Sequence, residues 1–367
     1  MKVPYSYLPR QFDNPDPILA DIRSLVKEGN FTLGRPVEEF EEQFAEFIGT
    51  KYAVGVGSGT DALFLSLRTL DLQPGDEVIT ATNTFVATAG AIETAGAKIV
   101  FVDCNEKYVI DPTKIEAAIT DKTRAILPVH YSGQPADMPA IEAIAKKHRL
   151  PIIEDACCAI DAEIDGRRCG TMGMTAAFSL HPLKNLNVWG DAGVITTNDK
   201  AIADKLRLMR NHGMKDRDTY EFYAYNSRLD TLQSIVGKHL LKDVKWITEK
   251  RIEVAKRFDD AFRPLEDLVV LPERTKGERP VYHMYMMLTK NRDKFYQYLL
   301  DQGIDAKIHY PVPLHLQPAS AKLGYKKGDF PTAEFQAEHI VSLPVHQHLT
   351  EEEINYTVDT VQKYFKS

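Results

Sequence analysis

The sequence lacks long apolar runs and long runs of like charge. No stretch of its 367 residues approaches the roughly 18 consecutive apolar residues that a membrane-spanning helix needs, and residues 1–4 do not begin the apolar core of a signal peptide. The longest block of like charge is three glutamates at 351–353, and the net charge is −7. We therefore expect a cytoplasmic protein whose main partner is neither a membrane surface nor nucleic acid.

Cysteine is also scarce, with four residues in the chain: Cys104, Cys157, Cys158 and Cys169. Two of them are adjacent, and adjacent cysteines rarely bridge each other, so reduced thiols are expected in a chain without an export signal. The sequence contains no C-x-x-C pair. Because structural metal sites favour such pairs, we expect no metal site.

The remaining composition is that of an ordinary globular protein, 44% hydrophobic and 26% charged. Between residues 74 and 153 short apolar runs alternate with helical stretches. Strands are predicted at 77–80, 98–102, 125–129 and 151–153, and helices at 85–95, 112–119 and 138–148. This alternation predicts an α/β fold with a mostly parallel central sheet and helices on both faces.

The pattern changes after residue 197. A charged helix at 199–210 and a Tyr-rich loop at 220–228 precede a long helix through 246–262, and strand-like runs and helices follow from about residue 266. We therefore expect a large domain over residues 1–245 and a smaller α+β C-terminal domain over residues 246–367.

One lysine stands out from its surroundings. Lys184 lies between an apolar run at 175–180, which is typical of a buried strand, and a Gly-rich turn at 190–193. Lysine is seldom buried without a partner. Desolvation would lower the pKa of its amine, as a Schiff-base nucleophile requires. A surface lysine on a loop is the alternative interpretation.

A second candidate is the Gly-Ser-Gly-Thr turn at 57–60, which joins a short strand to a helix that begins near Asp61. Backbone N–H groups at a helix N-terminus bind anions, and Ser58 and Thr60 add hydroxyl donors, so the turn is a candidate phosphate cradle. A purely structural turn is the alternative. The turn matches neither the P-loop motif nor the dinucleotide fingerprint, so ATP and NAD are not indicated.

Chemically distinctive groups also lie at the ends of the predicted strands, where ligands bind in parallel sheets. They are Thr84-Phe85, His130-Tyr131, Glu154-Asp155 and Ser179 to His181. A carboxylate at such a position is costly without a cation or a donor, so Asp155 is either a cap for the next helix or a counter-charge for a protonated ring nitrogen. Phe85 is either a core aromatic or a residue that stacks on a flat ring.

The order of the motifs along the chain resembles that of a known family. The motifs are Ser58-Gly59-Thr60-Asp61, Thr84-Phe85-Val86-Ala87-Thr88, Gly133-Gln134-Pro135-Ala136-Asp137, Glu154-Asp155-Ala156, Ser179-x-His181-Pro182-x-Lys184-Asn185, Gly190-Asp191-x-Gly193, Asn226-x-Arg228, His309-Tyr310-Pro311 and Ser342-Leu343-Pro344. Over nearly the whole chain this set resembles the DegT/DnrJ/EryC1/StrS sugar aminotransferases, which are pyridoxal-phosphate enzymes of the aspartate-aminotransferase fold (fold type I).

The resemblance implies a role for individual residues. Lys184 would form the Schiff base with pyridoxal 5'-phosphate and act as acid and base, and Asp155 would pair with the ring nitrogen. The phosphate would be held by Ser58, Gly59, Thr60 and Ser179, Phe85 would stack on the ring, Asn226 would reach the phosphate of the neighbouring subunit, and His181, Arg228, His309 and Tyr310 would lie near the substrate. An active site completed across subunits implies a homodimer.

Three departures from the family pattern affect four positions. Cys158 replaces a glutamine that bonds the ring hydroxyl, Ile160-Asp161 replaces a common His-Gly, and Ala192 replaces a glycine of the turn. Because a thiol is a poor hydrogen-bond donor, we expect the tuning of the ring to differ.

The implied reaction moves an amino group from L-glutamate to an oxo-sugar, with 2-oxoglutarate released, for cell-surface polysaccharide or lipopolysaccharide. Segment 181–191, which contains Trp189, is similar to the subgroup that converts 8-oxo-3-deoxy-manno-octulosonate to 8-amino-3,8-dideoxy-manno-octulosonate. Alternatives are an acceptor that is a nucleotide-linked 3-keto or 4-keto hexose, a fold-type-I lyase or decarboxylase, and a non-catalytic sensor of the cofactor. A sugar dehydratase of the same family is disfavoured, because that branch replaces the lysine with histidine and Lys184 is present.

Overall fold

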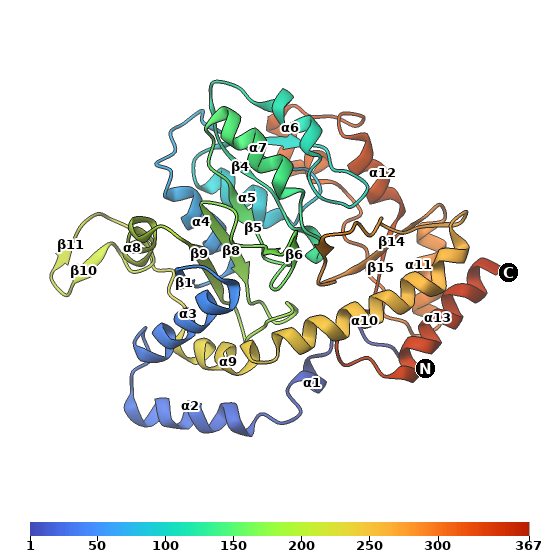
Figure 1. Cartoon of the computed structure of the whole chain (residues 1–367), viewed down its shortest axis with the longest axis horizontal. Coiled ribbons are helices and arrows are strands. Elements are labelled where there is room, and N and C mark those ends of the chain that lie inside the picture. The colour runs from blue at the N-terminus through green and yellow to red at the C-terminus, as the bar shows by residue number, and fades with distance from the viewer. Residues whose placement is uncertain (367) are drawn as a thin grey trace.

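Seven strands form the central layer of the protein, as seen in a computed structural model of residues 1–366 (Figure 1). One sheet has the order β1 (Tyr52–Val56), β9 (Gly193–Thr197), β8 (Thr175–Ser179) and β5 (Ile153–Asp155), and a second has the order β3 (Lys98–Val102), β2 (Glu77–Ala81) and β4 (Thr123–Leu127). Parallel bridges from Ile126 to Ile152 and from Val129 to Asp155 join β4 to β5. Only β9 runs antiparallel to its neighbours, so the predicted mostly parallel sheet is confirmed.

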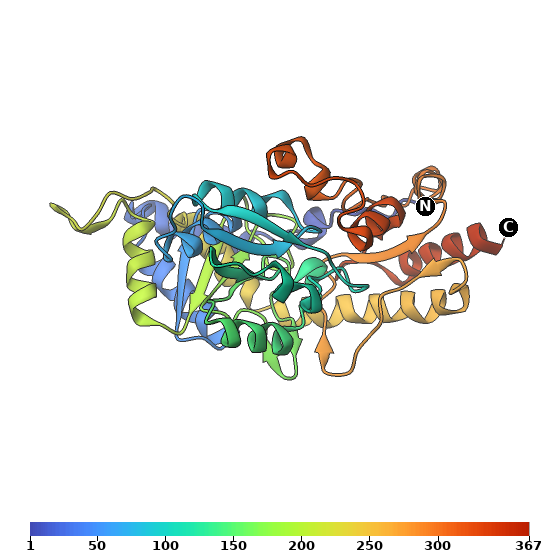
Figure 2. The same ribbon diagram turned by 90° about the horizontal axis from the view of Figure 1, so that it is seen from above.

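Side chains along these strands alternate between two hydrophobic cores, because successive residues of a strand point to opposite faces. Val54 and Ile195 pack into the core that contains α4 (Gly59–Arg68) and α5 (Val86–Thr94). Ala53 and Phe178 pack into the core that contains α3 (Arg35–Ile48) and α9 (Thr231–Leu241). Helices therefore cover both faces of the layer, as Figure 2 shows from above.

Five further helices belong to this part, and three of them match the helices predicted at 112–119, 138–148 and 199–210. They are α1 (Leu8–Gln11), α2 (Asp16–Glu28), α6 (Pro112–Ala118), α7 (Met138–His148) and α8 (Lys200–Met209). The predicted helix at 199–210 corresponds to α8, which begins after Asp199 because that side chain caps the N–H groups of Ala201 and Ile202.

The long helix α10 (Val244–Phe262) leads from this part to the C-terminal part (Figure 1). There the sheet order is β12 (Val269–Val270), β14 (Tyr285–Thr289) and β15 (Ile340–Leu343), all antiparallel, packed with α11 (Arg292–Asp301), α12 (Pro331–His339) and α13 (Glu351–Lys366). A third core contains Phe258, Phe262 and Tyr285. The division at residues 245 and 246 lies in the first turn of α10 and stays a prediction.

The N-terminal residues lie against the C-terminal part. Val3 forms a parallel bridge with Ile304, and its N–H donates to the carbonyl of Gly303 at 2.9 Å. The side chain of Val3 is fully buried in the third core. Residues far apart in the sequence are therefore neighbours, and the N-terminus lies on the same side of the molecule as α13 in Figure 1.

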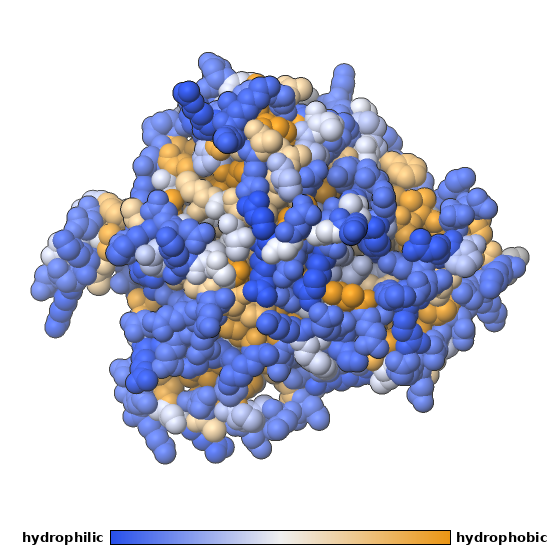
Figure 3. Space-filling view, in the orientation of Figure 1, coloured by the Kyte–Doolittle hydropathy of each residue, from blue (hydrophilic) through white to orange (hydrophobic). Residues whose placement is uncertain are grey.

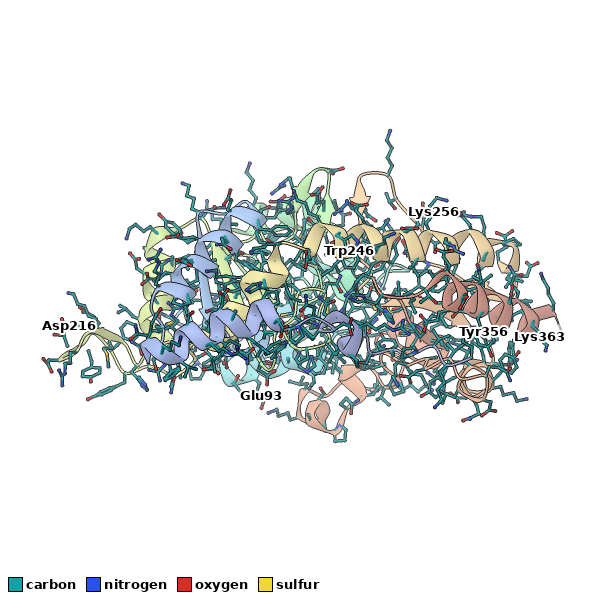
Figure 4. The ribbon with its side chains drawn as sticks, turned by 90° about the horizontal axis from the view of Figure 1, so that it is seen from below. Glu93, Asp216, Trp246, Lys256, Tyr356 and Lys363 are labelled. Atoms are coloured by element: carbon teal, nitrogen blue, oxygen red, sulfur yellow. The ribbon has the colours of Figure 1, made fainter. Side chains whose placement is uncertain are left out.

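Smaller elements complete the structure. A three-stranded sheet joins β13 (Glu278–Arg279), β6 (Glu163–Ile164) and β7 (Arg167–Arg168), and short 3-10 helices occur at Tyr131–Gly133, Arg263–Leu265, Leu314–Leu316 and Pro318–Leu323. The hairpin of β10 (Met214–Asp216) and β11 (Thr219–Tyr220) projects from the body, with Asp216 labelled on it in Figure 4. Polar residues cover most of the face in Figure 3. Among residues 1–366, no helix combines the length and apolar character needed to cross a bilayer.

Candidate active site

A cavity of about 380 Å³ lies at the carboxyl ends of β5 and β8 and extends to the C-terminal part. Ten of the twelve residues singled out from the sequence line it: Ser58, Gly59, Thr60, Phe85, Asp155, Ser179, His181, Lys184, His309 and Tyr310. A more open cavity of about 610 Å³ beside Asn105 and Pro112 contains none of them. The cavity of about 380 Å³ is therefore the candidate active site.

Lys184 lies in the loop that follows β8. Two backbone hydrogen bonds shape this loop, from Leu180 N–H to the carbonyl of Ala192 at 2.9 Å and from Val188 N–H to the carbonyl of Leu180 at 3.0 Å. The Nζ of Lys184 donates to the Sγ of Cys158 at 3.0 Å. The amine thus points into the cavity beside a thiol rather than into solvent, which disfavours the surface-lysine interpretation.

The expectation that burial lowers the pKa of Lys184 is wrong for this structure. Burial does disfavour the charged amine, but the neighbouring Cys158, Cys157 and Asp155 outweigh it and raise the pKa of Lys184 above its ordinary value. The sequence around Lys184 shows that its loop is apolar. It does not show which acidic groups the fold brings close to the amine. The lysine is therefore a cation at neutral pH unless a ligand changes its surroundings.

Asp155 ends β5 as a buried carboxylate, 5% exposed. Its Oδ2 accepts a hydrogen bond from Thr88 Oγ1 at 2.8 Å, and its Oδ1 accepts one from the N–H of Cys157 at 3.2 Å. The chain after Asp155 forms turns and short strands, and the next helix is α8, so Asp155 caps no helix. Two donors hold the carboxylate in place while it lines the cavity, which leaves it able to meet a cation.

The turn at residues 57–60 and the end of β8 form one concave surface. Ser58 is the N-cap of α4, and its Oγ accepts from the N–H of Asp61 at 3.0 Å. Ser179 Oγ accepts from the N–H of His181 at 3.3 Å. Both hydroxyl hydrogens remain free to donate, as do the backbone N–H groups of Gly59 and Thr60 in the first turn of α4. This surface has the donor set that binds a phosphate.

Glycine is required at this surface by close packing. A Cβ added to Gly59 would lie 2.6 Å from the Cβ of Ser179, and one added to Gly193 would lie 2.2 Å from the carbonyl oxygen of Ser58. Atoms cannot approach so closely, so any larger residue would push β8 or β9 away from the turn. The glycines therefore bring Ser58 and Ser179 together.

Aromatic side chains form another wall. Phe85 is 55% exposed and lines the cavity, so it is not a core aromatic. Its ring centroid lies 6.1 Å from that of Tyr310, which in turn lies 6.4 Å from that of Tyr131. Tyr131 Oη donates to the carbonyl of His309 at 3.0 Å. Burial, followed by the positive charges of Lys307 and Lys184, lowers the pKa of His309 to about 4, so its imidazole is neutral at pH 7.

Two residues singled out from the sequence do not reach the cavity of their own chain. Asn226 is exposed and forms a backbone bridge with Asn211, whose Oδ1 accepts from Arg228 Nη1 at 3.0 Å. His130, at another strand end, is also absent from the cavity. Its ring is fully buried against Glu154, with Nε2 at 3.0 Å from Oε2. The structure therefore does not place Asn226 or Arg228 with the other site residues.

Other cavity residues escaped sequence reasoning. Tyr5 and Tyr7 come from the N-terminal segment, Arg251 from α10, and His283 from the segment before β14. The Oη of Tyr7 donates to the backbone carbonyl of Lys184 at 2.7 Å, a contact between residues 177 positions apart. Two tyrosines at alternate positions near the N-terminus were the only signal, and it does not by itself indicate a site.

The lysine after β8, the carboxylate at the end of β5 and the anion-binding surface at the start of α4 suit a pyridoxal-phosphate site better than a nucleotide site. Residues 14–362 match the model of the DegT/DnrJ/EryC1/StrS aminotransferase family, and the chain belongs to that family.

Two relatives and two solved structures illustrate the similarity. The chain is 41% identical, over 100% of its length and 99% of the relative, to the pleiotropic regulatory protein of Geobacillus stearothermophilus. It is 39% identical, over 94% of its length and 91% of the relative, to the dTDP-3-amino-3,4,6-trideoxy-alpha-D-glucose transaminase of Streptomyces venezuelae.

The solved structure of S. venezuelae DesV with a ketimine intermediate superposes with a TM-score of 0.97, 38% identity and coverage of 100% of this chain and 99% of that one. NtdA from Bacillus subtilis with bound cofactor PMP gives a TM-score of 0.93, 30% identity and coverage of 100% and 86%. The predicted fold type I is confirmed.

Proposed function

We propose that this chain is a pyridoxal-phosphate-dependent aminotransferase that moves an amino group from L-glutamate to an oxo-sugar. The observation that carries the proposal is the convergence on one cavity of an amine, a held carboxylate and an anion surface. Each of these comes from a different strand end or helix end. The named activities of the transaminase relative and the bound cofactor of NtdA support the same reading.

The residues present fit the cofactor. Its phosphate would meet the hydroxyls of Ser58 and Ser179 and the N–H groups of Gly59 and Thr60 at the N-terminus of α4. When bound, pyridoxal phosphate supplies an electron sink for a carbanion at the substrate carbon. Phe85 is placed on the cavity wall, where a flat ring could stack.

Asp155 and Lys184 would then divide the acid–base work. Asp155, held by Thr88 and by the N–H of Cys157, would keep a proton on the ring nitrogen of the cofactor through its negative charge. Lys184 would hold the cofactor through its Nζ, and the same amine lies in the cavity where it would take and return a proton at the substrate carbon. Tyr7 holds the backbone carbonyl of Lys184, and Cys158 accepts from Nζ.

For the acceptor we propose a nucleotide-linked keto hexose. The support is the transaminase relative, whose name specifies a dTDP-linked amino sugar. The octulosonate acceptor rests only on the likeness of segment 181–191. In the structure Trp189 of that segment packs edge-on against Phe12, with ring centroids 5.5 Å apart, and does not line the cavity. Lipopolysaccharide as the destination of the product has the same limited support.

We also propose a homodimer with shared active sites. Asn226 is exposed and lies outside its own cavity, as expected of a residue that serves a neighbouring subunit. Large apolar side chains are exposed near the loops that surround the cavity, namely Phe85, Val86 and Leu183. A second copy would cover them and so bury apolar surface.

A non-catalytic sensor is the second candidate function. It is favoured by the name of the relative from Geobacillus stearothermophilus, a pleiotropic regulatory protein, at 41% identity over the whole chain. A sensor would bind the cofactor at the same residues and would show no turnover.

The test is a visible absorption spectrum of the purified protein with pyridoxal phosphate, recorded before and after L-glutamate is added. A visible band that bleaches with stoichiometric release of 2-oxoglutarate supports the aminotransferase. A band that ignores glutamate and every other amino acid favours the sensor. Absence of any band with added pyridoxal phosphate would overturn the proposal.

A further inference from the structure

Arg251 is the largest of the fully buried side chains in residues 1–366, and it has no acidic partner there. It occupies a position of the apolar stripe of α10, between the buried Ile247 and Val254. Its Nε donates to Gln347 Oε1 at 3.1 Å. Its Nη1 donates to the backbone carbonyls of Tyr282 at 3.0 Å and Val345 at 2.9 Å. Its Nη2 is buried without a hydrogen-bond partner in residues 1–366, and the guanidinium carbon lies 5.2 Å from the centre of the Tyr7 ring.

The other buried arginine in residues 1–366 is neutralised: Arg210, 6% exposed, pairs with the carboxylate of Glu41. The half-buried Arg274 also has an acidic partner, Asp259 at 2.9 Å. A buried cation without an anion is strongly unfavourable, because neither water nor an opposite charge compensates for its lost hydration. Residues 1–366 supply no anion for Arg251, so we expect its anionic partner to come from a bound molecule.

Two side chains near Arg251 add further unpartnered polar atoms. Tyr5 Oη and His283 Nδ1 are also buried without a hydrogen-bond partner in residues 1–366, and both residues line the cavity together with Arg251. Burial, followed by the charges of Lys184 and Arg251, holds the pKa of His283 well below its ordinary value. The imidazole is thus neutral and lies near both cations. Three elements distant in sequence place these polar groups along one wall.

We propose that Arg251, with Tyr5 and His283, forms the receptor for a substrate carboxylate, and that the amino-acid donor brings this carboxylate. The proposal rests on the proposed function, in which a dicarboxylic amino acid enters the cavity beside Lys184. A carboxylate accepts several N–H and O–H donors at once and neutralises the guanidinium. The candidate phosphate surface at residues 57–60 lies at the start of α4, whereas Arg251 lies on α10. The cavity therefore offers separate places for two anions.

Two sources share this chemistry, namely the carboxylate of the donor and the carboxylate of an acidic sugar. The donor is favoured because Arg251 is only 1% exposed and lies deep in the wall, where a small molecule reaches more readily than a sugar nucleotide. The experiment below separates the two sources by omitting any sugar.

The test measures the dissociation constant of succinate, an unreactive dicarboxylate, for the cofactor-loaded protein by calorimetry. Arg251→Lys should weaken succinate by about 10- to 100-fold, because a charge-assisted hydrogen bond is lost. Tyr5→Phe should weaken it by up to about tenfold, since a neutral donor is removed. Arg257→Lys is the matched control on α10 and should leave the constant unchanged, because Arg257 bonds Glu351 and Asn355 at the surface. Trp246 and Lys256, labelled in Figure 4, mark the stretch of α10 that contains Arg251.

A purely structural Arg251 predicts a different result. The lysine of Arg251→Lys can still donate to the carbonyls of Tyr282 and Val345, so a structural role would alter the melting temperature without altering succinate binding. If that variant does not fold, Tyr5→Phe decides, because Tyr5 Oη makes no hydrogen bond in the described chain. Succinate binding that is unchanged in both folded variants, or undetectable in the wild type, would overturn the inference.

The half-reaction with L-glutamate alone identifies the source and separates this inference from the proposed function. A half-saturation constant raised at least tenfold in Arg251→Lys assigns the site to the donor. If Arg251→Lys weakens the binding of succinate but leaves the half-saturation constant for glutamate unchanged, the donor assignment is overturned in favour of an acidic sugar. A wild type that binds succinate through Arg251 but reacts with no amino acid keeps the carboxylate receptor and refutes the proposed function.

Discussion

Gly59→Ala tests the proposed phosphate surface, which consists of the turn at residues 57–60 and Ser179 at the end of β8. The clash that the substitution creates can be worked out from the structure. The added Cβ would lie 2.6 Å from Ser179 Cβ, and 3.1 Å from both Ser179 Cα and Cys157 Sγ. Real carbon atoms do not approach to 2.6 Å, and the obstacle is a short side chain on β8 that cannot swing away. Overpacking of this kind typically costs about 1–3 kcal/mol. The higher helix propensity of alanine offsets at most about 1 kcal/mol of that cost.

The net loss of about 1–2 kcal/mol has two measurable consequences. The melting temperature of the cofactor-free protein should fall by about 1–3 °C for a chain of this length. The affinity for pyridoxal phosphate, measured by absorbance titration, should fall about 5- to 30-fold, because Gly59 and Ser179 are pushed apart and both are proposed phosphate ligands.

Gly90→Ala is the matched control for this change. Gly90 lies inside α5, and a Cβ added there would meet no atom within 4 Å. The control should therefore unfold at the same temperature as the wild type or slightly above it, since alanine favours the helix by about 0.5–1 kcal/mol. The reasoning is refuted if Gly59→Ala melts with the wild type and binds pyridoxal phosphate equally tightly.

Four further predictions concern single groups. Lys184→Ala should lower turnover with glutamate at least about a thousandfold at an unchanged melting temperature, and an active variant would refute the role of Lys184. Asp155→Ala should lower kcat by roughly two orders of magnitude or more with less effect on KM; a near-normal kcat in steady-state assays would show that the carboxylate is not needed. Arg210→Met should destabilise the fold by about 3–5 kcal/mol in urea unfolding, because it leaves Glu41 buried and unpaired, and a loss below about 1 kcal/mol would contradict this. His309 has a folded pKa of about 4 against an ordinary value of 6.5, so the unfolded chain binds the extra proton between these values. Stability should therefore fall by about 3 kcal/mol as the pH drops through that range, and His309→Gln, compared by thermal melts, should lose correspondingly less.

Local pattern predicted most of the large α/β part. Apolar runs bounded by turns identified β2, β3 and β8 to within one residue at either end. The strands predicted at 125–129 and 151–153 are displaced by about two residues from β4 and β5. The hydrogen bonds to neighbouring strands decide where β4 and β5 begin and end, and a short window of sequence does not reveal those neighbours.

The candidate site was only partly accessible to the same reasoning. Lys184 and Asp155 follow recognisable strands, so their position at one sheet edge could be expected. The positions of Tyr7 and Arg251 in the cavity could not be predicted. Each comes from an element whose sequence pattern does not indicate that it packs near Lys184. The pKa of Lys184 moves against the expected direction for the same reason, because Cys158 approaches through tertiary structure.

The amino-acid sequence by itself determined the class of fold, the strand ends that carry Lys184 and Asp155, and the glycines of the phosphate surface. These follow from periodicity and from local backbone chemistry, which act over a few residues. Tertiary structure alone decided that Tyr5, Arg251 and His283 share a wall of the cavity and that Asn226 and Arg228 lie outside it. Contacts such as that between Tyr7 and Lys184, 177 positions apart in the chain, depend on how whole elements pack, and no local pattern encodes them.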